Sequence, residues 1–193
     1  MTVTPPAPTN VNATASTATS VVVTWSFSGT VDSFQILRFD RAPGAPAGYR
    51  MVGTSLTNSF TDQNLTAATS YLYRIRSVVS GTVSPDSGTD VATTVMFGSN
   101  VAAGGIMEDA DILELRSAVT AMALLAGRAS PSYTDVSLAG VLVKSAHIQE
   151  LRTEVDAARS ALLLPAPVYT DQPLTAGTLI RAAHVLEIRG VVK

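Results

Sequence analysis

The chain has 193 residues, a formal net charge of −2 at pH 7, 15% charged residues and no cysteine. This length allows one large domain or two small ones, each able to bury its own core. The charge balance excludes a basic footprint for nucleic acid or an anionic membrane, and the lack of cysteine excludes disulfides and thiolate metal sites.

The first half of the chain alternates apolar and polar residues with a period of two, which is typical of half-buried antiparallel strands. The residues that share a face are Val21, Val23 and Trp25 in one run, Phe34 and Ile36 in the next, and Tyr71, Tyr73 and Ile75 in a third. Clusters of Gly, Pro, Ser and Asp separate the runs. About seven short strands at this spacing predict a seven-stranded immunoglobulin-like β-sandwich.

Three features of this half resemble a known family. The chain opens with "PPAPTNVNAT", Trp25 ends the second expected strand, and the run from Leu65 to Val78 reads "LTAATSYLYRIRSV". On these residues, the segment from about 5 to 94 resembles a fibronectin type III domain. The resemblance implies that Tyr71 forms the family's tyrosine corner, with its buried phenol bonded to a nearby backbone group. The loop "SGTVSPDSG" contains no Arg-Gly-Asp, so integrin binding gets no support.

The second half changes to Ala, Leu, Glu and Arg at helical spacing, which predicts helices with one apolar seam each. The seams are Ile112, Leu115, Val119, Met122 and Ala126, then Ile148, Leu151, Val155, Ala158 and Leu162, then Val185, Ile188 and Val192. We therefore predict a multidomain β + α chain: a β-sandwich at 1–96, a Gly-rich linker at 97–105 and an α-helical repeat domain at 106–193.

The helical segments align with one another. "AGGIMEDADILELRSAV" from Ala103 matches "AGVLVKSAHIQELRTEV" from Ala139 and "AGTLIRAAHVLEIRGVV" from Ala176. The pattern predicts about two and a half copies of 36–37 residues, whose helices stack because none can bury its seam alone. It resembles helical repeats that accompany fibronectin type III modules in exported bacterial proteins, a resemblance that implies no activity.

His147 and His184, the two histidines of the chain, occupy equivalent positions in the second and third copies. One interpretation is a metal site with the glutamate three residues later. Against it, the first copy has Asp111 at this position, and ligands from successive copies would lie about 8–10 Å apart, too far to share one ion. We expect instead a half-buried structural histidine bonded to a loop backbone group near the helix start, and neither a metal nor another cofactor.

Each helix also has a carboxylate edge and a guanidinium edge. The carboxylates are Glu114, Glu150 and Glu187, and the guanidinium groups belong to Arg116, Arg152 and Arg189. We expect the glutamate of one helix to pair with the arginine of the next, as flanking positions do in coiled coils. As exposed pairs they would set the register and contribute only about 0–1 kcal/mol each.

Tyr133 and Tyr169 follow the first two helices at equivalent places. We interpret them as packing residues between copies, with carbohydrate stacking as the alternative. Solvent-exposed tyrosines in a flat row would favour binding, and burial would count against it.

No catalytic motif stands out: the chain has no Gly-x-Ser-x-Gly elbow and no phosphate-binding loop. We expect a non-enzymatic structural, adhesion or spacer module of a larger secreted or cell-surface bacterial protein. Its partners would be other domains of the same polypeptide, and protein or polysaccharide at the cell surface. The alternative is a polysaccharide- or protein-binding accessory module of an extracellular hydrolase. The first ten residues do not form a signal peptide, so we expect an export signal upstream, and no apolar run of about 18 residues predicts membrane insertion.

Overall fold

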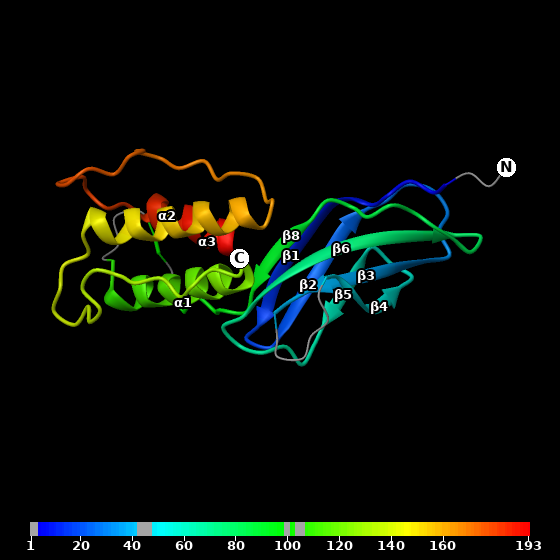
Figure 1. Ribbon diagram of the computed structural model, residues 1–193, viewed down its shortest axis with the longest axis horizontal. Coiled ribbons are helices and arrows are strands. Elements are labelled where there is room, and N and C mark those ends of the chain that lie inside the picture. The colour runs from blue at the N-terminus through cyan, green and yellow to red at the C-terminus, as the bar shows by residue number, and fades with distance from the viewer. Residues whose placement is uncertain (1–3, 42–47, 99–100, 103–106) are drawn as a thin grey trace. The chain divides into compact units, whose positions relative to one another are not determined.

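The computed structural model describes residues 4–41, 48–98, 101–102 and 107–193. The chain divides into two compact units, Met1–Thr94 and Val95–Lys193. The described strands all belong to the first, the sandwich unit, and the described helices to the second, the helical unit (Figure 1). Of the linker predicted at 97–105, residues 99–100 and 103–105 lie outside the described residues, as does residue 106 of the predicted helical domain.

The sandwich unit consists of two antiparallel sheets. One sheet has the order β1 (Thr9–Thr17), β2 (Ser20–Ser26) and β5 (Ser59–Asp62). The other has the order β4 (Arg50–Ser55), β3 (Ser33–Phe39), β6 (Ser70–Val79) and β7 (Thr82–Val83), and β8 (Asp90–Thr93) also pairs with β6. The described residues thus form eight strands where the sequence predicts about seven. One of them, β7, has only two residues and pairs with the end of β6.

The predicted alternation builds the core of the sandwich unit. Successive strand residues point to opposite faces, so the apolar residues of β2, β3 and β6 meet between the sheets. The Trp25 ring packs edge-on against Phe34 with ring centroids 5.1 Å apart. The tyrosine corner is present, because the Tyr71 hydroxyl accepts the Thr66 N–H at 2.9 Å.

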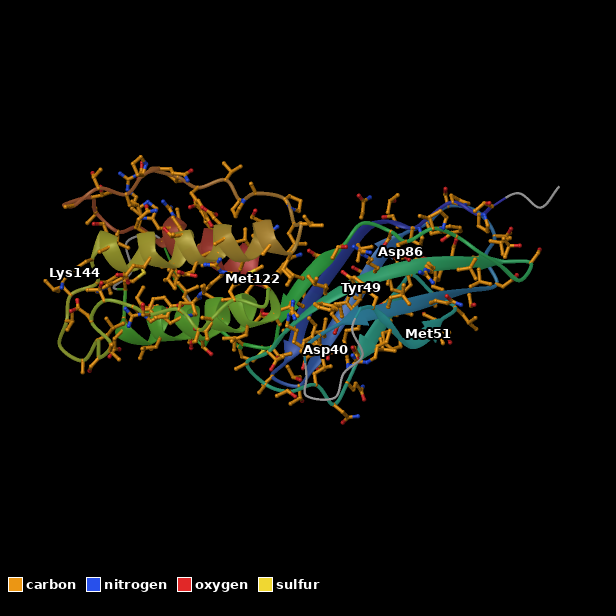
Figure 2. The ribbon with its side chains drawn as sticks, viewed as in Figure 1. Asp40, Tyr49, Met51, Asp86, Met122 and Lys144 are labelled. Atoms are coloured by element: carbon orange, nitrogen blue, oxygen red, sulfur yellow. The ribbon has the colours of Figure 1, made fainter. Side chains whose placement is uncertain are left out.

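The helical unit contains α1 (Asp109–Leu125), α2 (Ser145–Ala161) and α3 (Ala182–Val192). Figure 1 shows α1 and α2 side by side, and α3 contacts both. The predicted seams are buried between the helices except at Ala126 and Leu162, which are the C-cap residues of α1 and α2. Met122, labelled in Figure 2, is one of the fully buried seam residues. Within the described part of the chain, none of these helices has the length and apolarity that a membrane span requires.

Long connections without helices or strands join the helices, at residues 126–144 and 162–181. Both begin with the same turn. The N–H of Gly127 donates to Leu124 and that of Arg128 to Ala123, and Leu163 and Leu164 donate to Ser160 and Arg159 in the same pattern. This is the Schellman ending of a helix, which places its central residue in the left-handed region, with φ of 73° at Gly127 and 56° at Leu163.

Candidate functional site

Each of the two histidines caps the N-terminus of its helix. His147 is fully buried, and its Nδ1 accepts the backbone N–H of Lys144 at 3.2 Å. His184 accepts the N–H of Arg181 in the same way, also at 3.2 Å. In α1 the equivalent acceptor is Asp111 Oδ2, which takes the N–H of Glu108 at 2.9 Å. An aspartate can replace a histidine here because both offer an acceptor to an otherwise unpaired N–H at the helix start.

The second ring nitrogen of each histidine lies against an aspartate of the preceding loop. A backbone N–H can only donate, so Nδ1 is unprotonated and the neutral ring carries its proton on Nε2. His147 Nε2–H then donates to Asp135 at 3.0 Å, and His184 Nε2–H to Asp171 at 3.2 Å. The expected backbone partner near the helix start is therefore present in both helices. The carboxylate is an additional partner that was not expected, and the rings are fully buried, not half-buried.

The Asp135 carboxylate accepts hydrogen bonds from two residues, Lys144 and His147. The Lys144 ammonium, at the start of α2 in Figure 2, donates to Asp135 at 2.6 Å. This hydrogen bond first, and that from His147 second, hold the pKa of the Asp135 carboxyl below its usual range. The carboxylate is ionised at neutral pH and ties the loop after α1 to the start of α2.

The arginines are the main departure from expectation, because two of them are buried rather than exposed. Arg152 is 1% exposed and donates to the carbonyl oxygens of Thr170 at 2.9 Å and Asp171 at 3.3 Å. Its guanidinium also lies 4.6 Å from the ring centroid of Tyr169. The expectation of weak exposed pairs is therefore wrong for Arg152. Its apolar methylene groups can be buried at low cost, and its guanidinium group is buried because it supplies the hydrogen bonds that the loop carbonyl groups need.

Arg116 repeats this arrangement one helix earlier. It is also buried and donates to the carbonyl oxygens of Thr134 at 2.6 Å and Asp135 at 3.0 Å. Its guanidinium lies 4.7 Å from the ring centroid of Tyr133. Each of these arginines thus anchors the Tyr-Thr-Asp segment that follows its own helix.

The glutamates hold the same segments from the other side. The Thr134 N–H donates to the Glu150 carboxylate, and the Thr170 N–H donates to Glu187 at 3.0 Å. Ion pairs between an arginine and the glutamate of another helix join Arg152 to Glu187 at 3.0 Å and Arg189 to Glu114 at 3.5 Å. Arg116 and Glu150 are not paired with each other but both bond to Thr134: Arg116 donates to its carbonyl oxygen, and Glu150 accepts from its N–H.

The two tyrosines differ in accessibility. Tyr169 is 7% exposed and donates its hydroxyl to Asp156 at 3.1 Å, and burial raises the pKa of its phenol. Tyr133 is half-buried and borders a hollow of about 240 Å³ that Leu113, Pro131 and Val136 also line. Tyr169 therefore offers no face for a sugar to stack on, whereas Tyr133 is only partly buried.

The histidines are not arranged for catalysis or metal binding. Both nitrogens of each ring are engaged and both rings are fully buried, so a substrate in solvent cannot reach them. In the described ranges, no group of three or more His, Asp or Glu side chains is placed to hold a metal ion.

Sequence reasoning missed Asp135 and Asp171 as histidine partners, although a signal existed. Each histidine follows a Tyr-Thr-Asp segment, at spacings of 12 residues (147 − 135) and 13 residues (184 − 171). The chain before α1 lacks this segment, and α1 also lacks the histidine, having Asp111 at that position. Aspartate in the loop and histidine in the helix occur together, which indicates a pair.

The sandwich unit has its own buried ionic cluster. Arg38 donates to Asp40 at 2.9 Å and to Asp62 at 2.7 Å, and Arg50 donates to Asp40 at 2.6 Å. The Tyr73 hydroxyl donates to Asp62 at 3.0 Å. Both carboxylates are buried, so the cluster is closed to ligands and links β3, β5 and β6 internally.

Comparison with known proteins agrees with this fold. Residues 6–92 match the family model of the fibronectin type III domain. The sandwich unit is a fibronectin type III domain. Exoglucanase B from Cellulomonas fimi is 34% identical over 103 residues, which are 53% of this chain and 9% of that protein. The chain thus spans less than a tenth of the length of this relative.

Solved structures with similarity to this fibronectin type III domain share little sequence. A Fn3-like protein from Clostridium thermocellum is 22% identical, with a TM-score of 0.41, covering 47% of this chain and 94% of that one. Titin kinase with its flanking domains is 15% identical, with a TM-score of 0.42, covering 61% of this chain and 20% of that one.

Proposed function

We propose that the chain is a non-catalytic structural, adhesion or spacer module of a larger bacterial protein that is secreted or held at the cell surface. In this proposal the three helices are copies of one helix-plus-loop unit, and the partners of the module are other domains of the same polypeptide. Fibronectin type III domains are typically non-catalytic modules, which agrees with this role.

The main support for this proposal is that the polar side chains of the helical unit are buried and bond within the unit. His147, Arg152 and Tyr169 are each at most 7% exposed, and their polar atoms bond to other residues of the helical unit. Residues that would be the first candidates for a ligand therefore hold the unit together. Such a unit is suited to keep a fixed shape between other domains.

A second function has specific support: a polysaccharide- or protein-binding accessory module of an extracellular hydrolase. The relative with 34% identity is named an exoglucanase, and Tyr133 borders a surface hollow with apolar walls. A sugar ring could stack on a partly open tyrosine, and a glucan is the polysaccharide that this relative suggests.

A depletion assay separates the two functions. The 193-residue protein is mixed with microcrystalline cellulose, and with soluble β-glucan in an affinity gel, with serum albumin as the non-binding control. A spacer remains in the supernatant and migrates like the control. Retention that Tyr133→Ala abolishes, and that Leu142→Ala at an exposed loop leucine leaves intact, would overturn the spacer function in favour of glucan binding.

A further inference from the structure

The third arginine, Arg189, forms contacts that mirror those of Arg116 and Arg152, but with the beginning of the helical unit. Its guanidinium lies 4.7 Å from the ring centroid of Phe97, as those of Arg116 and Arg152 lie 4.7 and 4.6 Å from their tyrosines. Phe97, Tyr133 and Tyr169 are evenly spaced by 36 residues (133 − 97 and 169 − 133). Phe97 thus occupies, before α1, the place that the tyrosines occupy before α2 and α3.

The residue after the aromatic ring repeats the second contact. The Gly98 N–H donates to Glu114 of α1 at 2.9 Å, as the Thr134 and Thr170 N–H groups donate to the glutamates of α2 and α3. We call the set formed by an arginine, an aromatic ring and the next glutamate a junction. Junctions join α1 to α2, α2 to α3, and α3 back to α1.

We infer that the helical unit is a closed ring of three helix-plus-loop units, in which Arg189 and Phe97 form the closing junction. The described contacts between α1 and α3 agree with closure, since an open row would leave its first and third helices apart. The place that a further helix would need beside α1 is taken by α3. The repeat is also more complete than two and a half copies, because each helix has its own aromatic segment before it.

Asp111 differs from the equivalent histidines because it bonds to both the start of α1 and Arg189 of the closing junction. Its Oδ2 accepts the Glu108 N–H, as the histidine ring does in α2 and α3, and its Oδ1 accepts from Arg189 at 2.9 Å. A histidine at this position could satisfy the N–H but would present Nε2–H to a guanidinium, two donors facing each other. The one aspartate among two histidines is therefore explained by closure.

This ring concerns the fold of the module and holds whether or not the module binds a glucan. The test is a double-mutant cycle in the full 193-residue protein, followed by circular dichroism at 222 nm in urea, where the described helices give the signal. Arg189→Met should lower the folding equilibrium constant of the helical unit by about 100-fold, and Asp111→Asn by about tenfold. Because Arg189 and Asp111 are hydrogen-bonded to each other although they lie 78 positions apart in the chain, the double variant should lose about 100-fold.

A loss of about 1,000-fold in the double variant, the product of the two single effects, would overturn the ring. Arg128→Met combined with Asp111→Asn is the matched control, because Arg128 pairs with Glu154 elsewhere, and its effects should multiply.

A second variant keeps the inference testable if Arg189→Met fails to fold. Phe97→Leu retains an apolar side chain but removes the ring current, so the Arg189 Nε–H signal should move downfield in a ¹H–¹⁵N spectrum. An unmoved Arg189 signal would place Phe97 away from Arg189 and overturn the closing junction.

Discussion

The two units of this chain both direct arginine side chains toward buried partners, but for different purposes. In the sandwich unit Arg38 and Arg50 donate to two buried carboxylates, Asp40 and Asp62, so two positive charges neutralise two negative ones. In the helical unit Arg152 donates chiefly to loop carbonyl oxygens, with Glu187 as its carboxylate partner. The difference follows from how each unit satisfies its backbone.

Strands pair their N–H and C=O groups in ladders, and the sandwich core can then consist of aromatic and β-branched residues such as Trp25 and Val23. The helical unit has long connections that no ladder satisfies, and buried carbonyl groups need donors. A guanidinium group has five N–H donors in a planar fork, so a single arginine can hold two successive carbonyls. A helical unit with long loops therefore depends on a few buried charges, where a sandwich depends on its apolar core.

Removing one such arginine should have the largest effect. Arg152→Met removes the guanidinium donor of two loop carbonyls and the cationic partner of Glu187, and we expect a loss of about 3–5 kcal/mol from the free energy of unfolding of the helical unit. Urea titration followed at 222 nm measures it. Arg128→Met is the control, because Arg128 forms an exposed pair with Glu154 and should cost only about 0–1 kcal/mol. Equal effects of the two variants would show that burial of the arginine has no special role.

A cavity in the helical seam should have the next largest effect. Leu151 is fully buried, and Leu151→Ala should destabilise the helical unit by about 2–5 kcal/mol through lost burial and the cavity left behind. The chain has one tryptophan, Trp25 in the sandwich core, so its fluorescence reports on the sandwich unit alone. We expect the fluorescence midpoint to stay unchanged. If fluorescence and the 222 nm signal shift together, the two units do not unfold independently.

The elements of both units could be predicted from the sequence because burial imposes a period on it. Leu151 and Val155 fall on one helical face, and Val21 and Val23 on one strand face, whatever else surrounds them. The burial of Arg152 could not be predicted from such a period. A helical wheel places it at the edge of the seam, and its inward direction depends on carbonyls in a loop that has no period.

The site was predictable in its residues but only partly in its pairings: two of the expected arginine–glutamate pairs between helices are present, whereas the aspartate partners of the histidines were not foreseen. The equivalence of His147, His184 and Asp111 indicated a common structural position, which the three helix-start hydrogen bonds explain. The contact of Arg189 with Phe97 joins the two ends of the helical unit, and no local pattern reports a contact over such a separation.

A single substitution in the turn that ends α2 should raise the stability of the helical unit. It tests the difference between this turn and the equivalent turn after α1. Leu163 has φ of 56° and is 90% exposed, whereas the equivalent residue after α1 is Gly127. A leucine in this conformation is strained and here gains no burial, so Leu163→Gly should stabilise the helical unit by about 0.5–1 kcal/mol. The reverse change, Gly127→Leu, should destabilise it by a similar amount. Thermal unfolding at 222 nm measures both, and a loss of stability in Leu163→Gly would show that the leucine side chain forms a contact that outweighs the strain.

The smallest effect should come from titrating Asp135. Its pKa is lowered in the folded state by Lys144 and His147, so its contribution to stability is present above the unfolded pKa and is lost as the pH falls through the folded one. The window therefore lies below about pH 4, the ordinary value for aspartate. Because Asp135 is partly exposed, solvent screens its interactions and keeps the effect small.

A difference measurement isolates this carboxylate from the others that titrate in the same range. The free energy of unfolding of the helical unit is measured at pH 7, 5, 4 and 3 for the wild type and for Asp135→Asn. Other acidic residues contribute equally to both proteins and cancel in the difference. The advantage of the wild type should shrink as the pH falls below about 4, because protonated Asp135 resembles asparagine. A difference that stays constant down to pH 3 would mean that the charge of Asp135 does not stabilise the start of α2, and that His147 and Lys144 need only a neutral acceptor there.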